Sequence, residues 1–301
     1  MFHQSDPRSV LEPGASVPPH GQGPYPSAEY VKFHDVPPYE SDSTARTWYV
    51  RGQHFVVAYT EAVDLTSLSR PEQPDEYMVL VPDRQGKVRI HVEDGVTDVD
   101  GSHLVVVPPG ASTITSAPGR IVRIFTSQSP DLVRRCINAA SYAIPHRYVG
   151  SFDPWPSPSG GFHLRVYDLN VPNQQGRFGR IFRCTGLMVN VLYPWLGPRD
   201  ASRLSPHHHD DFEQGVLALE GEYIQHHRWA WTPDRTEWRE DQHTTVTSPS
   251  LLVIPPPAIH TTQAVGEGIN QIVDIFSPPR ADFSQLSGWV LNADDYPAPV
   301  R

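Results

Sequence analysis

The chain has 301 residues, of which 38% are hydrophobic and 19% charged, a composition typical of one or two globular domains and not of a disordered chain. The formal charge of −10 argues against sequence-independent binding to nucleic acid and against adsorption to an anionic membrane, because both need a basic surface. The 32 prolines argue against a helical bundle, and the two cysteines, Cys136 and Cys184, exclude a disulfide scaffold.

The N-terminal residues MFHQSDPRSV lack the apolar segment of a secretory signal, and the sequence contains no run of about 20 apolar residues that would predict a transmembrane helix. We therefore expect a cytoplasmic protein. Residues 1–28 are rich in Pro, Gly and Ser and show no periodicity, which predicts an irregular N-terminal arm.

Residues 29–150 are expected to form a β-rich N-terminal domain. Short runs of strand-forming residues are separated by turn residues such as Asp94-Gly95, as in TWYV, HFVVAYT, EYMVLVP, KVRIHVE, SHLVVVPP and IVRIFTS. Residues 131–141 are the best helix candidate in this half, because Leu132, Cys136 and Ala139-Ala140 are spaced to share one face.

The second half, residues 151–301, repeats the pattern of the first. It opens on a predicted linker, SFDPWPSPSGG, and continues with runs such as RIFRCTGLMVNVLY, QGVLALEG and SLLVIPP. SHLVVVPPGAST followed by RIVRIFTSQSPDL matches PSLLVIPPPAIH followed by NQIVDIFSPPRADF. A repeat half the chain long predicts two copies of one domain, and many short strands joined by Pro/Gly turns predict two small β-barrels or double-sheet jelly rolls.

A cluster of histidines in the second half suggests a metal site. In SPHHHDDFEQG, His207 and His209 lie two residues apart, so on an extended segment their side chains share a face while His208 points away. Imidazole suits Zn, Fe, Ni, Mn or Cu. Glu213 and Gln214 are nearby candidates for a further ligand, and His260 follows an apolar run that a barrel would bring to the same cavity.

These residues resemble the two motifs of the cupin superfamily. His207 and His209, four residues, Gln214, six residues and Gly221 are similar to the first motif, and PPPAIH ending at His260 is similar to the second, with proline where glycine is usual. Glu213 fits an alternative spacing, so either residue could be the third ligand. The resemblance implies an all-β bicupin with two tandem jelly-roll barrels, few short helices, and metal ligands His207, His209, Gln214 and His260.

The first half does not repeat the ligand set. Aligning the repeats places Arg70, Glu72, Tyr77 and Thr113 opposite the four ligand positions of the second half, and none of these matches the set that the resemblance implies. We therefore expect an N-terminal cupin domain without a metal site that supports the other domain or lines a dimer interface. The resemblance also implies a homodimer.

Two further residues are candidates for catalysis. The strand after Gly221 alternates Tyr223, Gln225, His227, Trp229 and Trp231, and such a face could line a pocket or pack between sheets. His227 is a candidate acid or base because its ordinary pKa lies near neutrality. Arg183 or Arg180 could bind a substrate carboxylate with the two-pronged geometry of guanidinium.

Three functions remain open at this point. The resemblance implies one divalent ion per chain, which we expect to be Fe(II), with Zn, Mn or Ni as alternatives, and a dioxygenase acting on a small aromatic or carboxylate-bearing substrate. A neutral Gln214 ligand raises the alternative of a non-redox lyase, isomerase or hydrolase on a small acid, because the ion would keep its full charge. A cupin that binds a small ligand without catalysis is the third.

Overall fold

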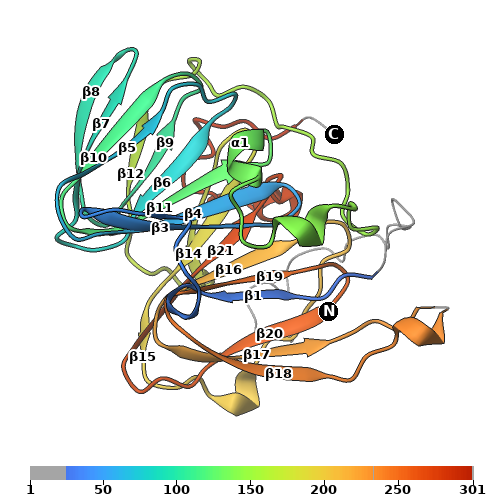
Figure 1. Cartoon of the computed structure of the whole chain (residues 1–301). Coiled ribbons are helices and arrows are strands. Elements are labelled where there is room, and N and C mark those ends of the chain that lie inside the picture. The colour runs from blue at the N-terminus through green and yellow to red at the C-terminus, as the bar shows by residue number, and fades with distance from the viewer. Residues whose placement is uncertain (1–24, 233, 300–301) are drawn as a thin grey trace.

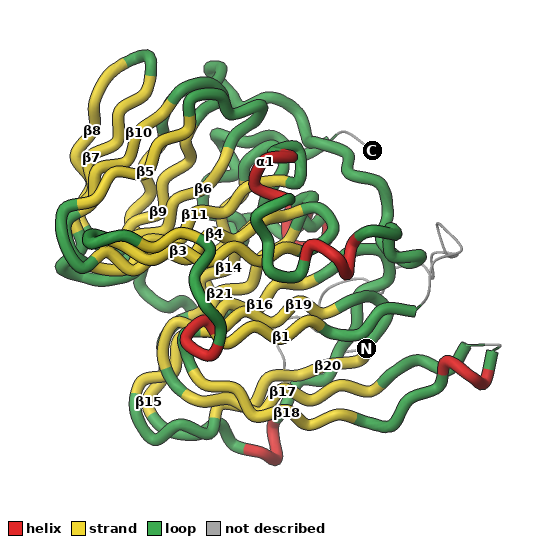
Figure 2. Tube along the Cα trace, viewed as in Figure 1, coloured by secondary structure: helices red, strands yellow, loops and turns green. Residues whose placement is uncertain are grey.

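The structure is a computed structural model that describes residues 25–232 and 234–299, so residues 1–24 of the expected N-terminal arm lie outside it. Strands dominate these residues, and the only α-helices among them are α1 (Pro130–Val133) and α2 (Ala281–Gln285) (Figure 2). Four short 3-10 turns occur at Phe33–Asp35, Ala139–Tyr142, Ala201–Arg203 and Arg235–Glu237. The expected all-β class is confirmed. Within the described part, no helix has the length and hydropathy needed to cross a membrane.

Each half of the molecule is built on one large and one small antiparallel sheet. In the N-terminal half the large sheet has the order β12 (Arg165–Asp168), β9 (His103–Val107), β6 (Tyr77–Val81), β11 (Gly119–Thr126), β4 (Phe55–Ala62), β3 (Ala45–Arg51) and β2 (Glu40–Ser41). The small sheet has the order β5 (Thr66–Arg70), β10 (Ser112–Ser116), β7 (Lys87–Val92) and β8 (Gly95–Asp100).

The C-terminal half repeats this plan. Its large sheet has the order β1 (Glu29–Lys32), β19 (Ser250–Ile254), β16 (Gln214–Glu220), β21 (Ile269–Phe276), β14 (Met188–Leu192) and β13 (Gly179–Arg183), and β15 (Trp195–Leu196) pairs with β21. Its small sheet has the order β18 (Gln242–Thr247), β17 (Glu222–Arg228) and β20 (Ile259–Ala264).

The two halves exchange one strand each. β1, near the N-terminus, pairs with β19 in the C-terminal half, and Figure 1 shows this blue strand beside the orange one. β12, which follows the predicted linker, pairs with β9 in the N-terminal half. The expected division at residue 150 therefore does not coincide with the sheets, because each large sheet is completed by a strand from the other side of that division.

The two large sheets also pack against each other through an apolar layer. Along β11, Val122 and Ile124 join this layer, which includes Leu217 and Val273 of the other half, whereas Ile121 and the other alternate residues face the interior of the N-terminal barrel. When both faces of a strand are buried, its sequence is a continuous run of apolar residues. The N-terminal half thus supports the C-terminal half within one chain, and the homodimer stays a prediction.

Each half contributes one buried glutamate whose carboxylate accepts hydrogen bonds from the other half. The Glu213 carboxylate accepts hydrogen bonds from the Gln53 backbone N–H at 2.5 Å and from the Tyr142 hydroxyl at 3.2 Å. The Glu76 carboxylate accepts the corresponding bonds from the Thr185 backbone N–H at 3.1 Å and from the Tyr296 hydroxyl at 2.7 Å. The sequence repeat is therefore also a structural one, and each half supplies the acceptor that the other needs.

The helix predicted for residues 131–141 is wrong in extent. After one turn in α1 the chain continues through turns, because Ile137 and Asn138 bind strand β3 instead of propagating the helix. The Ile137 N–H donates to the Tyr49 carbonyl, and the Asn138 side-chain amide pairs with both the N–H and the carbonyl of Arg51. A side-chain amide that pairs with backbone competes with helical hydrogen bonds.

Glu76→Gln should lower the free energy of unfolding by about 1–3 kcal/mol, because an amide cannot accept from all the donors that the buried carboxylate serves. Urea denaturation would measure the change. Glu93→Gln is the matched control, since Glu93 is exposed. Equal stability of the two variants would contradict the role of Glu76 in joining the halves.

Candidate metal centre

Three buried histidines converge at one end of the C-terminal barrel. His207 lies on the loop before β16 and forms a two-bond backbone bridge with His260 of β20, with N···O distances of 3.0 and 2.7 Å. The candidate ligand nitrogens of His207, His209 and His260 lie within 4.8 Å of one another. Across the described residues this is the one cluster of three or more His, Cys, Asp or Glu side chains with that spacing. His208 points away and lies 3.3 Å from Asp210.

Backbone carbonyls set the tautomers of two of these rings. Nδ1 of His207 donates to the Ser205 carbonyl at 2.9 Å, and Nδ1 of His260 donates to the Ala258 carbonyl at 2.9 Å. A carbonyl oxygen only accepts, so each Nδ1 carries the proton and each Nε2 presents a lone pair. Histidines that bind metals commonly donate from one ring nitrogen to a carbonyl or carboxylate, and this contact orients the other ring nitrogen toward the metal.

Gln214 directs its amide oxygen at the same point. Its Oε1 lies 2.8 Å from Nε2 of His209 and 3.2 Å from Nε2 of His260. Its amide NH₂ donates to Asp274 Oδ1 at 2.9 Å, and Asp274 accepts a second bond from Asn190 at 3.2 Å, so the amide cannot flip without losing a partner. The lone pairs of His260 Nε2 and Gln214 Oε1 face each other, an arrangement that a cation between them would stabilise. These four side chains could therefore hold a metal ion.

Glu213, the alternative third ligand, points the other way. Adjacent residues of an extended segment direct their side chains to opposite faces. The Glu213 carboxylate accordingly lies with Gln53, Tyr142 and His146, whose Nδ1 is 2.8 Å from Oε1. The geometry favours Gln214 over Glu213 as the residue that completes the histidine cluster.

A pocket of about 320 Å³ opens beside the cluster. His207, Gln214 and His260 line it together with Asp274, and its walls include the aromatic residues Phe178, Tyr193 and Trp195. Arg199 places a positive charge in the lining of this pocket. Its guanidinium donates to the Thr262 carbonyl at 3.0 Å and to the Ser205 hydroxyl at 2.8 Å, which holds it near the loop that carries His207.

The arginines selected from the sequence do not lie at this pocket. Arg183 is buried elsewhere: its Nε donates to the Tyr296 carbonyl at 3.0 Å and its guanidinium lies over the Trp155 ring, 5.2 Å from the centroid. Arg180 donates to the carbonyls of Leu169 and Leu192. The prediction that Arg183 binds substrate is therefore corrected: it fastens the C-terminal segment.

His227 is also absent from the pocket lining. It is 2% exposed, packs on Trp229 with ring centroids 5.9 Å apart, and hydrogen-bonds through Nδ1 with the Tyr30 hydroxyl at 2.9 Å. Burial, aided by the charges of His226 and His243, lowers the pKa of His227 from 6.5 to about 4. The ring is neutral at pH 7 and stacks on His260, with ring centroids 6.3 Å apart, but does not itself line the pocket, so the predicted acid–base role is not supported. Trp231 of the same series is 76% exposed.

Arg199, Asp274 and the aromatic wall of the pocket were not predicted from the sequence. Asp274 had a detectable signal, because it is a lone charge inside the apolar run QIVDIFS. Arg199 and Trp195 lie on the irregular segment before the histidine motif, where no periodicity assigns a direction to a side chain.

Comparison with known proteins supports the fold. No protein-family model matches the sequence, and no curated protein matches it. Among solved structures, oxalate decarboxylase of Lactobacillus farciminis in a formate complex is 12% identical, with a TM-score of 0.56 over 88% of this chain and 90% of its own. A variant oxalate decarboxylase of Bacillus subtilis is 14% identical, with a TM-score of 0.55 over 86% and 79%. AerE of Microcystis aeruginosa is 9% identical, with a TM-score of 0.52 over 84% and 98%. These likenesses confirm the expected bicupin fold.

Gln214→Ala should weaken Mn(II) affinity by about tenfold or more, because even residues that only orient metal ligands change affinity by about 10–100-fold. Glu213→Ala should leave the affinity close to that of the unchanged protein and lower stability instead, since its carboxylate joins the two halves. Calorimetric titration with Mn(II) and urea denaturation would separate the two effects. A larger loss of affinity in Glu213→Ala would reverse the assignment.

Proposed function

We propose that this chain with the bicupin fold is a metal-dependent enzyme that acts on a small carboxylate-bearing substrate in the C-terminal barrel. His207, His209, His260 and Gln214 would hold one divalent ion. The observation that carries the proposal is the convergence of these side chains, with three imidazoles and an amide oxygen directed at one point beside a pocket.

The donor set is compatible with several first-row metals. Three imidazoles and an amide oxygen are neutral, so a bound divalent ion would keep its full charge and act as a Lewis acid toward an anionic substrate. One of the similar solved structures is an oxalate decarboxylase of Bacillus subtilis whose description names Mn(II) centres. This likeness supports Mn(II) as a candidate ion, beside the Fe(II) that the motif resemblance implies.

The pocket supports a small anionic substrate. A volume of about 320 Å³ lies at the lower end of the range for small-molecule sites. Arg199 offers a guanidinium that suits a carboxylate, and its bonds to Thr262 and Ser205 hold it in a fixed orientation. The aromatic wall of Phe178, Tyr193 and Trp195 would exclude water from the body of the substrate.

Chemistry of the lyase type is favoured over dioxygenation. The structural neighbours are described as decarboxylases of a small acid, oxalate, and the fold is shared with them. Within this chain, Asp274 is engaged by Gln214 and Asn190, so we assign it to positioning the amide oxygen. The aromatic wall is the one feature that suits an aromatic substrate, and dioxygenation of such an acid is the second candidate.

Protein purified without added metal should contain about one divalent ion per chain, and that ion should be lost in His207→Ala. Elemental analysis would measure the content. On a panel of small carboxylic acids we expect metal-dependent CO₂ release without O₂ uptake. Iron together with stoichiometric O₂ uptake would select the dioxygenase, and protein without bound metal would overturn the proposal.

Arg199→Gln should raise KM for a carboxylate substrate by about thirtyfold or more while changing kcat less, because the guanidinium would bind the substrate equally in the ground state and in the transition state. Arg89→Gln is the control, since Arg89 is an exposed arginine of the other barrel, paired with Asp98. Steady-state kinetics would test this, and an unchanged KM in Arg199→Gln would remove Arg199 from the site.

A further inference from the structure

The N-terminal barrel contains a second and larger pocket, of about 900 Å³. It is lined by residues of β5, β11 and α1 and by the loops that adjoin them, including Leu68, Arg70, Arg123, Leu132 and Arg135. The metal-ligand cluster lies in the other barrel, so the role proposed for that cluster does not explain this pocket.

Arg123 points into this barrel. On β11 it shares a face with Ile121 and Phe125, which belong to the barrel core, and its neighbours Val122 and Ile124 face the other way. It is 3% exposed. Its Nε is buried without a hydrogen-bond partner among the described residues, and its guanidinium lies 5.7 Å from the centroid of the Phe125 ring. A buried guanidinium that lacks an anionic partner is strongly unfavourable.

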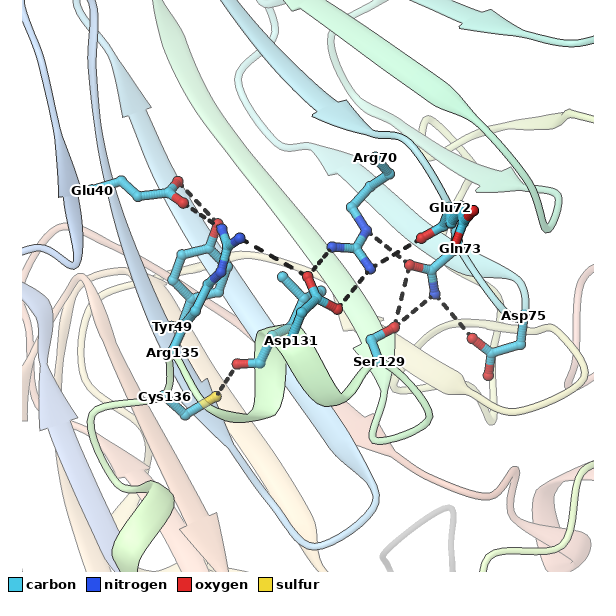
Figure 3. Close-up of polar contacts among 11 residues, drawn as sticks. Glu40, Tyr49, Arg70, Glu72, Gln73, Asp75, Ser129, Asp131, Arg135 and Cys136 are labelled. Carbon is cyan, nitrogen blue, oxygen red and sulfur yellow. Dashed lines mark hydrogen bonds and ion pairs between the residues drawn. The ribbon is translucent and has the colours of Figure 1, made fainter.

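The other two cations that line the pocket are already neutralised. Arg70 forms a two-pronged ion pair with Asp131, at 2.5 and 3.1 Å, and Arg135 binds Glu40 at 2.5 Å. Figure 3 shows these pairs as one continuous chain of contacts, in which Gln73 accepts from Arg70 Nε. These contacts engage Glu40 and Asp131, the two half-buried carboxylates of the lining, and leave neither for Arg123.

The pairing of charges leaves Arg123 without a carboxylate. The lining holds three arginines and three acidic residues, two of each are paired with one another, and the remaining acid, Glu72, is exposed to solvent. The positive charge of Arg123 also affects the pKa of two nearby tyrosines. Burial raises the pKa of Tyr49 and of Tyr77, and Arg123 opposes that rise.

The position of Arg123 is the counterpart of Asp274 in the sequence repeat. VRIFT in the first half aligns with VDIFS in the second, and both charged residues point into their own barrel. In the C-terminal barrel, Asp274 orients an amide oxygen toward the candidate cation site. The N-terminal barrel has the opposite charge at this position, which fits an anion.

We propose that the N-terminal pocket binds a small organic monocarboxylate through Arg123. A planar guanidinium matches a carboxylate in a two-pronged geometry, and one unmatched positive charge calls for a monoanion more than for a phosphate dianion. Leu68, Leu132 and the prolines at 71, 74 and 130 give the pocket apolar wall for the body of the ligand. The site needs no metal.

Calorimetric titration of the full chain, treated with a chelator, tests this with benzoate, its neutral analogue benzamide and inorganic phosphate. We expect benzoate to bind, benzamide and phosphate to bind much more weakly, and Arg123→Met to weaken benzoate binding by about thirtyfold or more. Arg89→Gln is the control, because Arg89 is an exposed arginine paired with Asp98. The comparison is made with Arg199→Gln in both proteins, so that the C-terminal pocket does not supply a second carboxylate site. Benzoate binding that survives the addition of Arg123→Met, or is absent without it, overturns the proposal. Phosphate binding tighter than benzoate binding overturns the choice of ligand.

Thermal unfolding without ligand gives an independent measure. Since Arg123→Met removes an unpaired buried charge and keeps an unbranched side chain, the variant should melt higher than the unchanged protein, by about 2–4 °C or more. Benzoate should raise the melting temperature of the unchanged protein and not that of the variant. A lower melting temperature in the variant would show that Arg123 serves the fold, and would overturn its role as a ligand-binding residue.

Discussion

The site depends on how the two large sheets hold each other. Glu213 and Gln214 are neighbours on one extended segment, and their side chains leave it in opposite directions. Glu213 fastens the segment to the N-terminal half, and Gln214 directs its amide oxygen at the three histidines. Because a slip of one residue would exchange these two faces, the contact between the halves also fixes the register of the candidate metal site.

The repeat allows the two barrels to serve different chemistry on one framework. The features that join the halves occur twice, as Glu76 and Glu213 show. The residues that face the two interiors have diverged: Tyr77 stands where the other barrel has Gln214, and Arg123 where it has Asp274. One barrel gathers neutral donors suited to a cation, and the other leaves a buried cation without a carboxylate. This divergence would account for the retention of both barrels.

Much of this could be predicted from the sequence, for local reasons. Alternating apolar runs and turn residues indicated the strands, and the spacing of His207, His209 and Gln214 indicated which side chains would share a face. The exchange of β1 and β12 could not be predicted, because it depends on pairing between segments far apart in the chain. Arg183 and His227 were misassigned because strand periodicity gives two faces without saying which face lines a pocket. Arg199 was missed because its irregular segment has no periodicity at all.

Crystals of the unchanged protein grown with Mn(II), with anomalous diffraction used to locate the ion, would show whether the four side chains hold a metal. We expect one strong anomalous peak in the C-terminal barrel, with Nε2 of His207, His209 and His260 and Oε1 of Gln214 at coordination distance. No peak at that point, or a peak beside Glu213 and His146 instead, would contradict this expectation.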